Sequence, residues 1–392
     1  MTNLYIFPDG VQRVVHDEAM AAAVPRVMER YGVRRAVIVC SKSLRDKTDV
    51  IARLVDVLGD RAIGVIDDVG EHSPLQNVLA GARKIRDLGA DIIISVGGGS
   101  TLDFSKFVQL CMTENVYERD ALLQFQWAMS ASGDEILSTS HKLPVIRQIA
   151  VPTTLATAEW TPGGTPLDEV TGMKARLMAT AGAPLAIVYD PSLLRHTPVK
   201  LLAATGIRGL DHAINTACAD DPHPFTTLLC EQAIVLYIKN LRRLVEPGVP
   251  DSVYSACQLA TWYTGMGQFS MSHYHGFSHF MVHVLAPYAG VGHSDAACVL
   301  MLAQARWLES AAREQHARIL ELLGMRDRRF ADVLYELLLA LGLPTTLSDL
   351  GMDASSVEGV VPLALAHPMV TKHNLRPVTT AQDIRNILSL VR

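Results

Sequence analysis

Short runs of apolar, mostly β-branched residues recur through the first half of the chain, separated by longer stretches that include polar positions. Such runs, without polar alternation, are typical of strands that are buried on both faces. Five are predicted to be strands: residues 35–40, 62–67, 91–96, 148–153 and 185–190. The stretches between the first three are long enough for crossover helices, so the pattern predicts a parallel sheet covered on both faces.

The pattern changes near Pro198, beyond which strand signals stop and apolar residues recur at helical spacing. The clearest helical stretches are residues 224–244, 252–267 and 331–343. Thr380–Asp383 predicts a capped start for a last helix. We therefore expect an α/β domain over residues 1–194 and an all-helical domain over residues 195–392. Residues 113–143 form a long connection to which the sequence assigns no role.

Composition and charge narrow the class of protein. The 392 residues are 49% hydrophobic and 19% charged, which is typical of globular proteins, and a net charge of −5 without a basic stretch argues against nucleic acid as a partner. No apolar run reaches membrane-spanning length and the first ten residues lack signal-peptide features, so we expect a cytoplasmic protein with no membrane partner. The six cysteines lie singly among apolar neighbours, which predicts buried thiols without disulfides or a thiolate zinc site.

The clearest binding signal is a predicted strand that leads directly into glycines and then a helix, in DIIISVGGGSTLDFSK. Gly97, Gly98 and Gly99 allow positive φ and close approach of a ligand, and the first N–H groups of the new helix favour an anion. The expected ligand is a pyrophosphate, with Ser100 beside it, although Leu102 breaks the common GxGxxG pattern. The alternative is an ordinary tight turn between strand and helix.

A second candidate segment, PTTLATAEWTP, follows the fourth predicted strand. Its Thr153 and Thr154 would lie at the same edge of the sheet as the glycines, since parallel sheets bind ligands at the carboxyl ends of their strands. Ser41 follows the first predicted strand, where dinucleotide enzymes often place an acid against the ribose 2′-hydroxyl. With a serine there, Lys42 or Arg45 could accept a 2′-phosphate, so the pattern leans toward NADPH.

Histidines gather in the helical half, at His212, His279, His283 and His293. His279 and His283 are four residues apart and share a helix face, as do Arg208 and His212. Three imidazoles would make a cation site if a carboxylate stood at position 208, but arginine is always charged and only donates. Whether the chain uses a metal therefore depends on this one position.

Together these segments resemble the iron-containing (group III) alcohol dehydrogenase family over nearly the whole chain. The matching motifs are GGGSTLDFSK, PTT, TGMK, YDP, HAIN and an HxxxH followed by GH. The resemblance implies a dehydroquinate synthase-like architecture, in which an α/β domain and a helical domain enclose a cleft that holds NAD(P) and a carbonyl-polarising divalent ion. The expected cofactor-binding residues are Gly97, Gly98, Gly99, Ser100, Asp103, Thr153, Thr154, Lys174 and Ser41.

The metal site of the family is altered in this chain. Carried over by position, three of its four ligand places are filled, by His212, His279 and His293. The fourth place, an aspartate in the family, falls on Arg208. Asp211 does not replace it, because neighbouring side chains on a helix point about 100° apart. The guanidinium repels a divalent ion, although three histidines alone can hold zinc.

A second departure concerns the threonine-rich segment. PTTLATAE is one residue shorter than its counterpart in the metal-dependent members, and its spacing is similar to that of the maleylacetate reductase branch, which works without metal. HSPLQNV, YDP and RPVT are also similar to that branch, although Arg208 is not its usual residue. The resemblance places the chain nearer this branch, but it does not carry a substrate over.

We therefore expect an NAD(P)H-dependent oxidoreductase that reduces a small anionic carbonyl or enone without a catalytic metal. Arg208 would bind the anionic group, His279 or His283 would donate the proton, and His212 would help to stabilise charge. Two alternatives stay open: a metal-dependent dehydrogenase with iron or zinc on its three ligand histidines, and a non-catalytic nucleotide-binding protein. The expected assembly is a homodimer.

Structural roles compete with some of these assignments. Arg208 could simply pair with Asp211 on a solvated helix face. Asp103 could stabilise the start of its helix or contact a ribose, and Lys106 could be structural or touch the cofactor.

Overall fold

The chain divides into two compact units, one ending at Thr197 and the other beginning at Pro198. The computed structural model describes residues 10–129, 136–137, 140–270, 276–367, 369–372 and 374–392. Over these residues, no helix is both long and apolar enough to cross a membrane.

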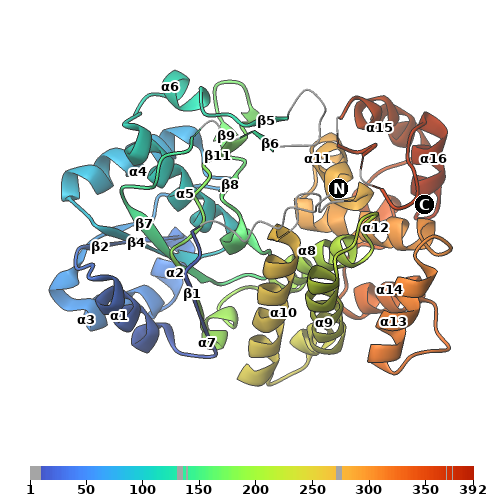
Figure 1. Cartoon of the computed structure of the whole chain (residues 1–392), viewed down its shortest axis with the longest axis horizontal. Coiled ribbons are helices and arrows are strands. Elements are labelled where there is room, and N and C mark those ends of the chain that lie inside the picture. Colours follow the sequence, from blue (N-terminus) through green and yellow to red (C-terminus); the bar gives the residue numbers. More distant parts are fainter. Residues whose placement is uncertain (1–9, 130–135, 138–139, 271–275, 368, 373) are drawn as a thin grey trace. The chain divides into compact units, whose positions relative to one another are not determined.

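A six-stranded, all-parallel sheet forms the centre of the first unit (Figure 1). Its strands are β1 (Arg13–His16), β2 (Ala36–Cys40), β3 (Ala62–Ile66), β4 (Ile92–Gly97), β7 (Arg147–Pro152) and β12 (Ala186–Tyr189), in the order β1-β12-β7-β4-β2-β3. The five predicted strands and their parallel arrangement are confirmed. The prediction that all five are buried on both faces is wrong for β3, which is largely half-buried because it has a neighbour on one side only.

Helices cover both faces of this sheet. The helices α1 (Met20–Tyr31), α2 (Lys42–Lys47) and α3 (Val50–Leu58) cover one face, and α4 (Leu75–Leu88) and α5 (Gly99–Glu114) cover the other. Successive residues of a strand point to opposite faces, so Ile38 packs with the first group, whereas Val37 and Val39 pack with the second. The two apolar layers cover the faces of the sheet, so a ligand can reach it at the ends of its strands.

Short elements complete the first unit. They are α6 (Arg119–Leu123), α7 (Pro191–Leu194) and three antiparallel ribbons: β5 (Ala128–Met129) with β6 (Ile136–Leu137), β8 (Gly163–Gly164) with β11 (Leu177–Met178), and β9 (Leu167–Asp168) with β10 (Met173–Lys174). Part of the unassigned connection 113–143 therefore forms α6 and the first ribbon.

The second unit is helical, as predicted. Its helices are α8 (Val199–Ala217), α9 (Pro224–Leu241), α10 (Asp251–Phe269), α11 (Phe277–Ala289), α12 (His293–Trp307), α13 (Arg313–Leu323), α14 (Phe330–Ala340), α15 (Ala354–Ala366) and α16 (Ala381–Ser389). The predicted capped start of the last helix is confirmed: Asp383 N–H donates to Thr380 Oγ1 at 3.1 Å, and Thr380 N–H donates to Asp383 Oδ2 at 2.8 Å. The α8 helix packs against α9, α10, α11 and α12 and so brings its polar residues into the interior.

All six cysteines are free and buried, as predicted.

Candidate functional site

The glycine turn joins the end of β4 to the start of α5. Gly98 is the N-cap of α5, with an extended backbone, and no side chain caps this helix. The N–H groups of Gly99 and Ser100 lie in the first helical turn, where a helix offers them no acceptor. An uncapped helix start at the carboxyl edge of a parallel sheet fits the pyrophosphate of a dinucleotide.

Packing, rather than backbone conformation, explains the glycines. None of the three has a positive φ, so that part of the prediction is wrong. A Cβ at Gly97 would lie 2.5 Å from Thr101 Oγ1, and one at Gly98 would lie 3.0 Å from Thr154 Cγ2. A Cβ at Gly99 would meet Ala158 Cβ at 3.6 Å, an ordinary contact. The first two glycines thus allow the turn to pack closely against its neighbours.

The threonine-rich segment continues from β7 beside this turn. Thr153 N–H donates to the carbonyl of Gly97 at 2.9 Å, and the carbonyl of Thr153 accepts from Thr197 Oγ1 at 2.7 Å. The structure therefore brings the two predicted segments together at one edge of the sheet.

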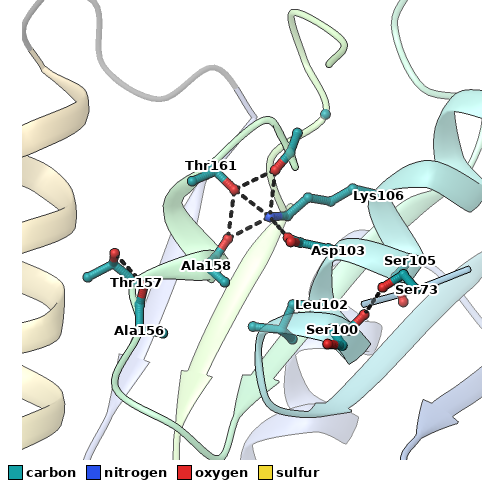
Figure 2. A network of polar contacts seen from close by, with 12 residues as sticks. Ser73, Ser100, Leu102, Asp103, Ser105, Lys106, Ala156, Thr157, Ala158 and Thr161 are labelled. Carbon is teal, nitrogen blue, oxygen red and sulfur yellow. Dashed lines mark hydrogen bonds and ion pairs between the residues drawn. The ribbon is translucent and has the colours of Figure 1, made fainter. Parts of the chain in front are cut away.

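Lys106 joins α5 to the threonine-rich segment (Figure 2). Its ammonium donates to Asp103 Oδ1 at 2.7 Å, to the carbonyl of Ala158 at 2.6 Å and to Thr161 Oγ1 at 2.6 Å. The side chain is 1% exposed and these contacts use its three protons. Of the two roles considered for Lys106, the contacts favour the structural one.

A buried carboxyl, Glu159, lies in the short 3₁₀ helix η2 (Ala158–Trp160) beside these contacts. Tyr189 Oη donates to Glu159 Oε1 at 2.6 Å, and Trp160 Nε1 donates to Tyr189 Oη at 2.8 Å. Burial raises the pKa of Glu159 to about 7, although the hydrogen bond from Tyr189 lowers it. Glu159 is not predicted from the sequence, where its only signal is an acid in a segment of small and apolar residues.

The HSPLQNV segment also reaches the glycine turn. Ser73 Oγ donates to the carbonyl of Ser100 at 2.7 Å, and both His72 and Ser73 have positive φ, which is unusual for residues with a side chain. The pKa of His72 is lowered by burial and by the charge of Lys174, which places that lysine nearby. Of the expected cofactor residues, Ser100 and Lys174 thus lie beside one loop.

Ser41 follows β2 and caps the next helix, because its Oγ accepts from Leu44 N–H at 3.2 Å. Arg45 on that helix donates from Nη1 to Asp67 Oδ2 at 2.7 Å. Asp67 directly follows β3 and was not singled out from the sequence. The surroundings expected to be basic therefore contain a carboxylate.

In the helical unit, the structure brings four histidines into a row. The ring centroids are 5.0 Å apart for His212 and His279, 5.4 Å for His279 and His283, and 5.5 Å for His283 and His293. They come from α8, α11 and the first residue of α12. His212 and His279 are buried, whereas Arg208, one turn before His212, is half-buried. Two further histidines, His273 and His275, for which the sequence predicts a place in the core or at the surface, lie outside the described residues.

This set of side chains differs from the metal site that the resemblance implies. Over the part of the chain that the structure describes, no group of three or more His, Cys, Asp or Glu side chains is arranged to hold one. The imidazoles follow one another in a row, and the carboxylate place of the family is taken by Arg208, a cation.

A buried polar network connects the helices that carry these residues. Asp211 Oδ1 accepts from Ser278 Oγ at 2.6 Å and from Asn215 Nδ2 at 3.0 Å, while Asn215 Oδ1 accepts from Gly276 N–H and Gln304 Nε2. Burial raises the pKa of Asp211 to about 6, although Ser278 and the charge of Arg208 lower it. The expectation that Asp211 lies on a solvated face is wrong, because it is 1% exposed.

Profiles of one protein family match both units of the chain. The profile of the iron-containing alcohol dehydrogenase family matches residues 11–191, and that of the Fe-containing alcohol dehydrogenase family, C-terminal, matches residues 202–391. Maleylacetate reductase 2 of Cupriavidus pinatubonensis is 29% identical over 80% of this chain and 76% of its own length. The 1,3-propanediol dehydrogenase of Klebsiella pneumoniae is 29% identical over 85% of this chain and 86% of its own.

Solved structures share the fold over the full length. The crystal structure of maleylacetate reductase from Rhizobium sp. strain MTP-10005 superimposes with a TM-score of 0.81 and 23% identity, covering 100% of this chain and 98% of the other. The two family profiles together span both units of the chain and lead to one assignment. The chain belongs to the iron-containing alcohol dehydrogenase family and is an NAD(P)-dependent oxidoreductase.

Proposed function

We propose that this oxidoreductase reduces a small anionic carbonyl or enone substrate with NAD(P)H and without a catalytic metal. The observation that carries the proposal is Arg208, which stands one helical turn before His212 where the metal-dependent members place an anionic ligand. A guanidinium cannot bind a cation, but it binds a carboxylate through two parallel hydrogen bonds.

Two observations support an anionic substrate. Arg208 is a half-buried cation one helical turn before His212, and its charge lowers the pKa of the buried Asp211. Several relatives are named maleylacetate reductases, after a substrate that is an organic anion. The name of the 1,3-propanediol dehydrogenases, by contrast, refers to an uncharged diol.

The histidines supply the proton chemistry in this proposal. Reduced nicotinamide provides a hydride to the electrophilic carbon, and the negative charge that develops needs a stabiliser and a proton. Arg208 orients the anionic group, His212 stabilises charge, and His279 or His283 donates the proton. The contact between the rings of His279 and His283 makes both candidates for this transfer.

The cofactor would lie on the glycine turn of the first unit. We assign to it Gly97, Gly98, Gly99, Ser100, Asp103, Thr153, Thr154, Lys174 and Ser41. The uncapped start of α5 supports the pyrophosphate contact, and the bond between Thr153 and Gly97 supports a shared surface. The same proposal divides the chain into domains at residues 1–194 and 195–392. It also includes a homodimeric assembly, which sedimentation velocity tests.

The test compares Arg208→Ala, Arg208→Lys and wild type with maleylacetate as the anionic substrate and 1,3-propanediol as the uncharged one. We expect Arg208→Ala to raise the KM for maleylacetate roughly tenfold or more, with the KM for cofactor nearly unchanged. Arg208→Lys keeps the charge but loses the fork, so it should recover only part of the affinity. Equal increases in both KM values would contradict the assignment.

Metal content decides between this proposal and the metal-dependent alternative. Elemental analysis of the purified, active chain should give iron and zinc far below one ion per chain, and activity should survive a chelator. Stoichiometric iron or zinc that activity requires would overturn the metal-free reaction and return His212, His279 and His293 to the role of ligands.

A further inference from the structure

An acidic residue stands at the carboxyl edge of the sheet, close to the glycine turn. In the parallel register, Cys40 of β2 lies beside Val96 of β4, and Val39 of β2 lies beside Ile66 of β3. By the same register, Ser41 is level with Gly97, and Asp67 is level with Cys40. In this way Gly97, Ser41 and Asp67 follow one another across three neighbouring strands.

The spacing of these strands suits one nucleoside. Adjacent strands lie about 4.8 Å apart, so Asp67 stands two spacings, roughly 10 Å, from the glycine turn. A dinucleotide whose pyrophosphate lies on such a turn places its adenosine ribose over a neighbouring strand end, where an acid hydrogen-bonds the 2′-hydroxyl. The residue at the end of β2 is Ser41, whose hydroxyl already caps a helix. The nearest acid along this edge comes from β3.

We propose that Asp67, held in place by Arg45, is the carboxylate that binds the adenosine ribose and selects NADH over NADPH. The inference rests on the proposed function only in taking NAD(P)H as the cofactor. The sequence favours NADPH because Lys42 and Arg45 follow the first predicted strand closely, whereas Asp67 follows the second one.

The ion pair between Arg45 and Asp67 explains both the binding of a ribose hydroxyl and the rejection of a 2′-phosphate. Arg45 Nη1 is 2.7 Å from Asp67 Oδ2, and the two side chains are 50% and 27% exposed. Within the described residues, Asp67 Oδ1 has no hydrogen-bond partner, so it can accept from a ribose hydroxyl. Arg45 is already paired, so it does not act as a free clamp for a 2′-phosphate, and Asp67 repels that dianion.

The buried thiol of Cys40, the last residue of β2, lies in the field of the same ion pair. Burial is the main cause that raises its pKa to about 12, and Asp67 raises it further, by more than Arg45 lowers it. Asp46 adds to the same effect. Asp67 alone thus outweighs the guanidinium at this strand end, which disfavours an added phosphate.

The test measures binding without turnover, on the full-length chain. Calorimetry gives the dissociation constants of 5′-AMP and adenosine 2′,5′-bisphosphate, and nicotinamide fluorescence gives those of NADH and NADPH. We expect wild type to prefer 5′-AMP and NADH. Asp67→Ala frees Arg45 and should shift the ratio toward the phosphorylated ligands by roughly tenfold or more.

Three further variants test whether the shift in the ratio comes from the charge of Asp67 and from the freed Arg45. Asp67→Asn keeps the shape of the side chain and should shift the ratio in the same direction. The double variant Asp67→Ala with Arg45→Ala should lose the gain for phosphorylated ligands, because the freed guanidinium is gone. Asp46→Ala removes an exposed charge next to Arg45 without touching the pair, and its ratio should stay within about twofold of wild type.

The outcomes separate this inference from the function on which it rests. A wild-type preference for NADPH, or an unchanged ratio in Asp67→Ala, would overturn the role of Asp67 and leave the oxidoreductase proposal intact. Failure of wild type to bind either dinucleotide would overturn both.

Discussion

The buried carboxyl of Glu159 should make the stability of the α/β unit depend on pH by an amount that can be calculated. Burial raises the pKa of this carboxyl from 4.5 to about 7, opposed by the hydrogen bond from Tyr189 and the charge of Lys106. The folded chain therefore holds a proton that the unfolded chain releases, so its stability is full at low pH and falls as pH rises from about 4.5 to about 7. A shift of about 2.5 pH units corresponds to about 3 kcal/mol.

Glu159→Gln should remove this dependence. Glutamine keeps an oxygen that accepts from Tyr189 Oη but does not ionise. Relative to the difference between the two proteins at pH 5, the variant should gain about 2–3 kcal/mol over wild type by about pH 8. The assay is hydrogen exchange of cofactor-free protein, with protection factors compared for amides of β4 and β7, because these amides report the opening of this unit alone.

The difference between variant and wild type is the quantity to follow, because Asp211 also has a raised pKa, of about 6, and affects both proteins equally. Glu29→Gln is the matched control, since it removes an exposed carboxylate from α1 of the same unit, and its difference from wild type should be flat with pH. A flat difference for Glu159→Gln as well would refute the reasoning.

Other predictions follow from packing and from buried polar contacts, and urea unfolding measures each of them. Gly97→Ala should cost about 1–3 kcal/mol because its Cβ would lie 2.5 Å from Thr101 Oγ1, whereas Gly99→Ala should leave stability nearly unchanged; equal effects would contradict the packing account. Lys106→Met should cost about 3–5 kcal/mol because it removes a buried ammonium that donates to Asp103, Ala158 and Thr161, and a loss below about 1 kcal/mol would argue against the network. Asn215→Ala leaves several buried groups unsatisfied and should cost at least about 3 kcal/mol; a smaller loss would mean that water replaces the amide.

The sequence predicts the layers of this fold well because strands buried on both faces require continuous apolar runs. It fails for β1, a run of four residues at the sheet edge, whose sequence RVVH has only two apolar positions. It also fails for the three ribbons, because strands of two residues have no periodicity to detect. Edges and ribbons depend on pairing partners that lie elsewhere in the chain.

The candidate site divides in the same way. The glycine turn and the histidines appear in the sequence because local motifs carry them. Asp67 does not, and the sequence leaves the role of Lys106 open, since these roles come from contacts with residues 22 positions away, at Arg45, and 52 positions away, at Ala158. Asn215 acts across 89 positions, where it accepts from Gln304. A side chain whose role is to join segments has no local signature.

The buried cysteines give each unit a chemical label of its own. Burial raises the pKa of Cys40 and Cys111 in the α/β unit, and of Cys218, Cys230 and Cys257 in the helical unit, to about 12, and it raises that of Cys298 further. Only thiolate reacts with alkylating reagents, so these thiols stay unmodified until the structure around them opens. A pulse of iodoacetamide followed by peptide mass spectrometry would therefore time the opening of the two units separately in the unmodified protein, with no added probe.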